Sequence, residues 1–121
     1  MAKSLNQLID QVAEFSEKRN WTNTNPNQLI SSILIELGEL AEHFQWKNEF
    51  KEYTDDEKLE IGYEMMDVLF YLFRLASKAD IDLDKAFADK IEKLEIKYPV
   101  GSDWKTQHDL YRKNGKNKRY D

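Results

Sequence analysis

The chain has 121 residues, of which 40% are hydrophobic and 34% charged, and its formal net charge is −5. This length is typical of one domain, and the acidic balance argues against a nucleic-acid partner, which requires a basic surface. Because the chain contains no cysteine, it has no disulfide and no thiolate metal site, which favours a cytoplasmic location. No apolar stretch reaches the ~18 residues of a membrane span, so we expect no membrane partner. The N-terminus leads from Met1 and Ser4 straight into a polar helical pattern, so we expect no secretory signal.

Charge divides the chain into two regions. Residues 100–121 hold six bases and three acids, a net charge of +3, so residues 1–99 carry −8. Apolar periodicity also fades after Pro99. We therefore expect residues 1–99 to form the folded domain. Residues 100–121 are predicted to form a basic C-terminal tail, partly disordered or docked on a neighbouring subunit.

Four amphipathic helical patterns precede the tail, and no segment shows the sustained alternation typical of a strand. The first pattern spans residues 5–18 and opens with a capping box formed by Ser4 and Gln7. The second begins at Pro26, directly after a capping asparagine, and continues to about Trp46.

The third pattern opens with a capping box of Thr54 and Glu57 and runs to residue 77 or 78. The fourth begins at Asp82, a capping residue, and ends before Pro99. Because the loops are short, neighbouring helices are expected to be antiparallel. The predicted fold is all-α, a four-helix protomer whose helices pack into a dimeric or tetrameric bundle. The third helix is apolar nearly all round, which predicts a subunit interface.

Two pairs of acids, each spaced three residues apart, lie on consecutive helices. At about 100° per residue, Glu36 and Glu39 share one flank of the second helix, and Glu64 and Asp67 share a narrow polar stripe on the third. If these helices are antiparallel neighbours, four carboxylates converge. Oxygen-preferring divalent cations, Mg²⁺ or Mn²⁺ as its substitute, would relieve their repulsion. No Glu-x-x-His motif occurs, which argues against a di-iron bundle.

Each of these residues also has a purely structural interpretation. An acidic stripe can be the solvated face of a helix, although this alternative is weaker for Glu64 and Asp67 because their stripe is narrow on an otherwise apolar helix. Arg74 can pair with Asp67 as a structural ion pair. Three aromatic side chains can stack a nucleobase or pack in an ordinary core: Trp21, Trp46 and Tyr71.

Four segments of the chain resemble one family. LISSILIELGELAEHFQWK at 29–47 and EMMDVLFYLFRLA at 64–76 are similar to the MazG-like all-α nucleoside triphosphate pyrophosphohydrolases, most of all to the small dCTP pyrophosphatase branch. FSEKRNW at 15–21 and KIEKLEIKYP at 90–99 resemble the same branch. One difference lies on the first helix, where Val12 occupies the position of an imidazole in that branch.

The resemblance implies a Mg²⁺-dependent hydrolase that cleaves a dNTP between its α- and β-phosphates, giving dNMP and pyrophosphate. The substrate would be dCTP or a related or modified pyrimidine, and the role would be house-cleaning of the nucleotide pool. The resemblance also implies a homo-oligomer, either a dimer or a tetramer built from two dimers. The metal ligands and catalytic residues of the family carry over to Glu36, Glu39, Glu64 and Asp67. Our own hypothesis is that one of these carboxylates, Glu39, orients or deprotonates the attacking water. The substrate contacts of the family carry over to Trp21, Trp46, Tyr71, Lys90 and Lys97.

Other functions stay open on the sequence alone. The chain can be a nucleotide-binding sensor that does not turn over its ligand. It can also be an α-helical oligomeric interaction protein whose acids form an ion network at an interface. A pyrophosphohydrolase with another substrate, such as dUTP or a damaged dNTP, is a third possibility.

Overall fold

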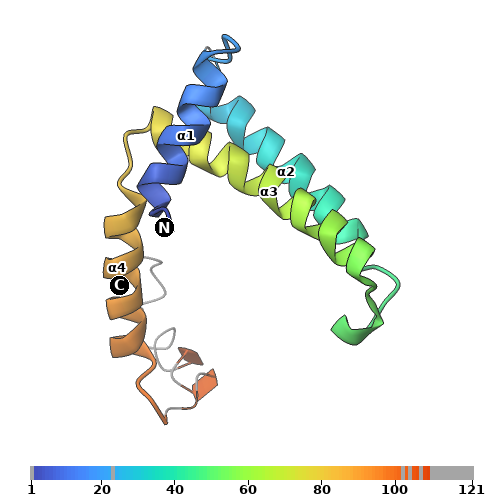
Figure 1. Cartoon of the computed structure of the whole chain (residues 1–121). Helices are drawn as coiled ribbons and strands as arrows, with labels where there is room; N and C mark the ends of the chain where they lie inside the picture. Colours follow the sequence, from blue (N-terminus) through green and yellow to red (C-terminus); the bar gives the residue numbers. More distant parts are fainter. Residues whose placement is uncertain (1, 23, 102, 104, 107, 110–121) are drawn as a thin grey trace. The chain divides into compact units, whose positions relative to one another are not determined.

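The computed structural model describes residues 2–22, 24–101, 103, 105–106 and 108–109. No strand occurs among these residues, and the predicted all-α four-helix class is confirmed (Figure 1). No helix in this part of the chain is long and apolar enough to cross a lipid bilayer. The elements are α1 (Leu5–Glu17), α2 (Pro26–Glu42), the 3₁₀ helix η1 (Phe50–Glu52), α3 (Asp55–Lys78) and α4 (Leu83–Lys97).

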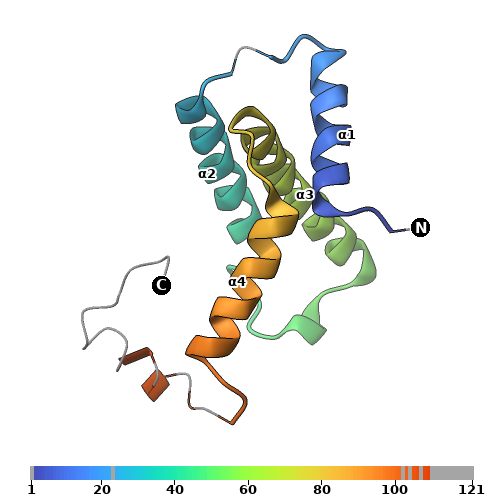
Figure 2. The ribbon, with the colours of Figure 1, turned by 90° about the vertical axis from the view of Figure 1, so that its left-hand side faces the viewer.

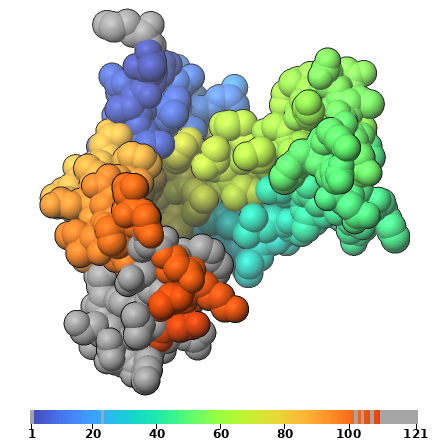
Figure 3. All heavy atoms as spheres, turned by 90° about the horizontal axis from the view of Figure 1, so that it is seen from below, coloured from blue at the N-terminus to red at the C-terminus, as the bar shows by residue number. Residues whose placement is uncertain are grey.

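The chain divides into two compact units, Met1–Ile81 and Asp82–Asp121. In the first unit α3 lies between α2 and α1 and packs against both (Figure 2). Helices α2 and α3 form an antiparallel hairpin, and α1 packs toward the end of this hairpin that is remote from the loop 43–54 (Figure 1, Figure 3). The second unit contains α4. The boundary expected after residue 99 stays a prediction, and most of the predicted tail lies outside the described residues.

Local capping chemistry sets the helix starts where the sequence predicted them. The side chains of Ser4, Asn25, Thr54 and Asp82 each accept a hydrogen bond from the backbone N–H three residues further on. At the first three caps the side chain of that third residue accepts a hydrogen bond from the N–H of the capping residue in return. These reciprocal pairs satisfy donors that a helix N-terminus would otherwise leave free.

Helix α2 ends at Glu42, earlier than the predicted end near Trp46, which was wrong. The apolar pattern continues to Phe44, but the backbone tightens into hydrogen bonds to the third preceding residue from His43 onward. Tyr53, which is buried, donates its hydroxyl to the carbonyl oxygen of His43 at 3.0 Å, and its ring centre lies 5.5 Å from that of Phe44. A contact from beyond the helix therefore stabilises the turn that ends it.

Much of the apolar surface of the hairpin is exposed in the protomer. Leu29 is fully buried, but Leu34 and Ile35 on α2 are each 63% exposed. On α3, Met65 and Met66 are 51% and 50% exposed. Exposed large apolar side chains on both helices favour a protein interface there.

Helices α1 and α3 are each followed by a non-glycine residue in the left-handed region, Asn20 with φ of 61° and Asp80 with φ of 55°. Around Asp80 the N–H of Ile81 bonds the carbonyl of Ala76 at 2.9 Å, and the N–H of Asp80 bonds the carbonyl of Ser77 at 3.3 Å. This pair of hydrogen bonds defines a Schellman cap, in which glycine is the usual left-handed residue. Asp80 also adds a negative charge beside the C-terminal carbonyls of α3.

Replacing Asp80 with glycine should raise the free energy of unfolding by about 1 kcal/mol, because it relieves the left-handed backbone and removes the charge at the helix end. Asp80→Asn, which removes only the charge, should give a smaller increase. Urea unfolding followed by far-UV circular dichroism measures both changes. A less stable Asp80→Gly variant would contradict this account of the cap.

Candidate functional site

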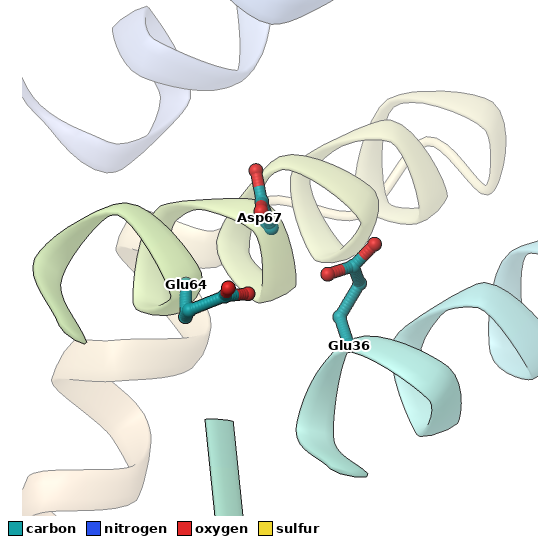
Figure 4. A group of neighbouring side chains, drawn as sticks. All are labelled: Glu36, Glu64 and Asp67. Carbon is teal, nitrogen blue, oxygen red and sulfur yellow. The ribbon is translucent and has the colours of Figure 1, made fainter. Parts of the chain in front are cut away.

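Carboxylates from α2 and α3 meet between the two helices. Glu36 extends from α2 toward α3, where Glu64 and Asp67 lie one turn apart (Figure 4). One oxygen of each residue lies within 4.8 Å of an oxygen of the other two. The spacing of three residues puts Glu64 and Asp67 on one face of α3, and the antiparallel hairpin brings Glu36 opposite them. The structure thus brings together three of the four predicted acids.

The clustered carboxylates repel one another and are incompletely solvated. Oε2 of Glu36 and Oε2 of Glu64 are buried and have no hydrogen-bond partner among the described residues. Burial raises the pKa of Glu36, and the hydrogen bond and charge of Glu39 and the charges of Asp67 and Glu64 raise it further. The charged form of Glu36 is therefore disfavoured unless a cation is present.

Glu39, the fourth predicted acid, lies at the exposed edge of the cluster. It follows Glu36 by one turn of α2, close enough to raise the pKa of Glu36. It is not one of the three residues whose oxygens lie within 4.8 Å of one another. Its side chain is exposed, as is that of Asp67, so Glu39 is the acid outside the cluster of three that has access to water beside Glu36.

His43 also lies beside the cluster, although it is not among the site residues predicted from the sequence. Its Nε2 lies 3.9 Å from Oε1 of Glu64. The helical spacing predicts His43 on the same flank of α2 as Glu36 and Glu39, although it does not identify His43 as a ligand. His43 follows Glu39 by four residues, whereas a Glu-x-x-His motif requires a spacing of three.

The acids have no basic partner from α3. Arg74 donates from Nη2 to the carbonyl oxygen of Trp21 and to Oγ1 of Thr24, each at 2.9 Å. The structural ion pair considered between Arg74 and Asp67 is therefore wrong. Within the described residues no lysine or arginine pairs with a carboxylate of the cluster.

Two of the predicted aromatic contacts belong to the same unit as the carboxylates and lie on the α1–α2 loop and on α3. Trp21 is 46% exposed, with its ring centre 5.8 Å from that of Phe15. Tyr71 follows Asp67 by one turn and is half-buried. Beside Tyr71 lies a cavity of about 600 Å³, lined also by Arg74 and by hydroxyl and amide side chains from the start of α2.

Trp46, the third predicted aromatic contact, lies in the loop after α2 and is 87% exposed. The loop around it is fixed by Lys47, whose Nζ donates to both carboxylate oxygens of Glu57 at 2.7 and 2.5 Å. The ammonium lies 4.9 Å from the ring centre of Tyr53. The hydrogen bond from Lys47, followed by that from the backbone of Thr54, lowers the pKa of Glu57 to about 2. The loop is therefore anchored while the Trp46 ring stays open to contact.

Lys90 and Lys97 lie on α4 in the second unit. The Nζ of Lys97 lies 5.2 Å from the ring centre of Tyr98. Their contacts with phosphate stay predictions.

The donor set of the cluster fits a hard divalent cation. Glu36, Glu64 and Asp67 offer only carboxylate oxygens, the ligands that Mg²⁺ prefers. A cation there would satisfy the buried Oε2 atoms of Glu36 and Glu64 and reduce the repulsion that raises the pKa of Glu36.

Three comparisons relate this chain to known proteins. The model of the MazG-like family matches residues 31–111. The dCTP pyrophosphatase 1 proteins of Rattus norvegicus and Homo sapiens are 36% and 35% identical to it over 93 residues, which is 73% of this chain and 55% of each relative. The chain thus spans about half the length of these curated relatives. The crystal structure of a pyrophosphatase from Archaeoglobus fulgidus DSM 4304 is similar with a TM-score of 0.69 and 37% identity, over 82% of this chain and 95% of that one.

The raised pKa of Glu36 makes stability depend on pH in the metal-free protein. The folded state holds the Glu36 proton more tightly than the unfolded chain, whose carboxyl titrates near 4.5. The destabilisation is therefore full at neutral pH and is relieved as the pH falls through the folded-state pKa. Thermal unfolding should show that Glu36→Gln is more stable than wild type at neutral pH and that this advantage shrinks on acidification.

A divalent cation should remove the same destabilisation. Mg²⁺ should raise the melting temperature of the wild type at neutral pH more than that of Glu36→Gln. Glu42→Gln, an exposed glutamate on the same helix, serves as the matched control and should follow the wild type. An equal Mg²⁺ effect in wild type and Glu36→Gln would contradict the role of this carboxylate.

Proposed function

Because the chain belongs to the MazG-like family, we propose that it is a divalent-cation-dependent nucleoside triphosphate pyrophosphohydrolase. It would cleave a dNTP between its α- and β-phosphates to the monophosphate and pyrophosphate. The observation that carries this proposal is the cluster of Glu36, Glu64 and Asp67, whose carboxylates pair with no lysine or arginine of the described residues. The similarity to proteins described as dCTP pyrophosphatase and pyrophosphatase supports the reaction class.

We propose different roles for the four acids. Bound divalent cations supply neutralisation of phosphate charge and a lowered pKa of water. Glu36, Glu64 and Asp67 would hold Mg²⁺, or Mn²⁺ as its substitute. Glu39, exposed beside Glu36, would orient the attacking water and accept its proton. The water oxygen bonds to the α-phosphorus, and the bond from that phosphorus to the bridging oxygen breaks, so that pyrophosphate leaves with the bridging oxygen.

The proposed substrate is dCTP or a related or modified pyrimidine dNTP, in keeping with the resemblance to the dCTP pyrophosphatase branch. The nucleotide pool makes the cytoplasm the proposed location. The nucleoside would be contacted by aromatic side chains and the phosphates by lysines: Trp21, Trp46, Tyr71, Lys90 and Lys97.

We also propose a homo-oligomer, a dimer or a dimer of dimers. Its support is the apolar surface that the protomer leaves exposed on α2 and α3, including Leu34 and Met65. A second copy of the chain would bury this surface with a gain of about 25 cal/mol for each Å² of apolar area.

The full chain incubated with Mg²⁺ and each of a panel of common and pyrimidine-modified dNTPs should release pyrophosphate and dNMP, fastest with a cytosine nucleotide. Glu39→Gln and Asp67→Asn should each lower turnover by about 100-fold or more, with an unchanged helical dichroism signal. Glu42→Gln, exposed on α2, is the matched control and should retain wild-type turnover.

The products distinguish the alternatives. Release of inorganic phosphate with dNDP would contradict cleavage at the α-phosphorus. Metal-dependent nucleotide binding without any product would indicate a sensor. Wild-type turnover in both Glu39→Gln and Asp67→Asn would contradict the assignment of the site.

Light scattering coupled to size exclusion should give a mass of at least two chains at micromolar concentration, because the exposed apolar surface of α2 and α3 requires a partner. Leu34 is 63% exposed, so Leu34→Glu should shift the mass toward the protomer, whereas Leu34→Met should not. A wild type that is monomeric at this concentration would contradict the proposed assembly.

A further inference from the structure

Two basic side chains near the C-terminal end of α3 hold the loop between α1 and α2. Arg74 donates from Nη2 to the carbonyl oxygen of Trp21 and to Oγ1 of Thr24, each at 2.9 Å. One turn further along, Lys78 donates from Nζ to the carbonyl oxygen of Thr22. These contacts join residues that are 50 or more positions apart in the sequence. The position of the loop therefore depends on α3.

The Arg74 guanidinium is buried without an acidic partner. The residue is only 7% exposed, and the ion pairs of the described residues do not include it. A buried cation is unfavourable unless hydrogen bonds satisfy it, and an apolar side chain of similar volume would pack at lower cost. What Arg74 adds over such a side chain is a pair of directional, charge-assisted hydrogen bonds to the loop.

The anchored loop places Trp21 at one end of a row of aromatic rings. Trp21 and Phe15 have ring centres 5.8 Å apart, and Phe15 and Phe70 are also separated by 5.8 Å. Phe70 in turn lies 6.0 Å from Tyr71, which ends the row. The guanidinium carbon of Arg74 lies 6.0 Å from the ring centre of Tyr71. Arg74 therefore contacts both ends of the row, the backbone of Trp21 and the ring of Tyr71.

Arg74 also forms part of the wall of two cavities. One of about 270 Å³ is lined by Trp21, and the other, of about 600 Å³, is lined by Tyr71. Sites for small molecules commonly measure about 300–1,000 Å³. The larger cavity also offers hydroxyl and amide groups, among them Ser32 and Gln28, that can hydrogen-bond a polar ligand.

Resting on the proposed function, we propose that Arg74 is a positioning residue for the nucleoside end of the substrate. By fixing the backbone of Trp21, it sets where the Trp21 ring lies relative to Tyr71, and so shapes the space that receives base and sugar. The clustered carboxylates are not among its contacts. Arg74 therefore acts on substrate binding and not on bond cleavage.

Kinetics of Arg74→Met separate these two effects, because methionine retains much of the length of the side chain but neither its charge nor its donors. KM for the preferred dNTP should rise about 10-fold, the loss expected for hydrogen bonds to a charged group. In contrast, kcat should change by less than about 2-fold. Arg74→Lys restores the charge without the planar fork and should recover part of the loss. Lys58→Met, exposed near the start of the same helix, is the matched control and should leave both constants unchanged.

Fluorescence tests the anchor without catalysis. The chain has three tryptophans, so Trp46→Phe combined with Trp104→Phe leaves Trp21 as the only indole. In that background, without nucleotide, Arg74→Met should increase acrylamide quenching of Trp21, and Lys58→Met should not. If the wild type hydrolyses no dNTP, the proposed function fails, but increased quenching would still support the anchor and unchanged quenching would overturn it.

Unchanged KM and unchanged quenching in Arg74→Met would overturn the proposal, and so would a loss of kcat at constant KM. If Arg74→Met loses its helical dichroism signal, Thr24→Val replaces it, because it removes one acceptor of Arg74 with little change of shape. That variant should raise KM about 3-fold, as expected for one hydrogen bond. A Thr24→Val protein with wild-type KM and quenching would overturn the proposal equally.

Discussion

The repulsion among Glu36, Glu64 and Asp67 is the constraint on which the rest of the structure depends. Two of their oxygens are buried without a hydrogen-bond partner, an arrangement that lowers stability and that packing elsewhere must offset. The hairpin of α2 and α3 meets this requirement through apolar residues on both helices, with Leu29 fully buried between them and the rest of the unit. The clustered carboxylates therefore lower the stability of the folded state at the centre of the hairpin, and a bound cation can restore it. Such a loss of stability is common at functional sites.

The helix starts could be predicted because the interactions that set them are local. A capping box joins residues three apart, so Ser4 with Gln7 and Thr54 with Glu57 are visible in the sequence. The end of α2 could not be predicted in this way. Its apolar period runs on past Glu42, and what stabilises the turn there is the hydroxyl of Tyr53, which belongs to another segment of the chain. Apolar periodicity predicts which face of a helix is buried. It does not predict where a side chain from another segment ends that helix.

In the candidate site, too, the local arrangement could be predicted from the sequence and the contacts between distant segments could not. The spacing of Glu64 and Asp67 fixes their common face, whereas the distance to Glu36 depends on how closely two helices approach. Arg74 shares their polar stripe, which suggested Asp67 as a partner. It lies about 10 Å further along the helix axis than Asp67, and its acceptors are on a loop that precedes α2. No local pattern identifies a backbone carbonyl as the partner of a buried guanidinium.

In the proposed site a single helix, α3, therefore carries two functions at a fixed separation. The middle of α3 supplies Glu64 and Asp67, where we place the phosphates, and its C-terminal part holds Trp21 through Arg74, where we place the nucleoside. Because a helix rises about 1.5 Å per residue and resists bending, the distance between these two regions is set by the number of residues between them. Helix α1 contributes no acid to the cluster, but Phe15 links the Trp21 ring to Phe70 on α3. The mutual placement of cation site and loop is thus determined by α3, and the role of α1 is to support the ring that the loop presents.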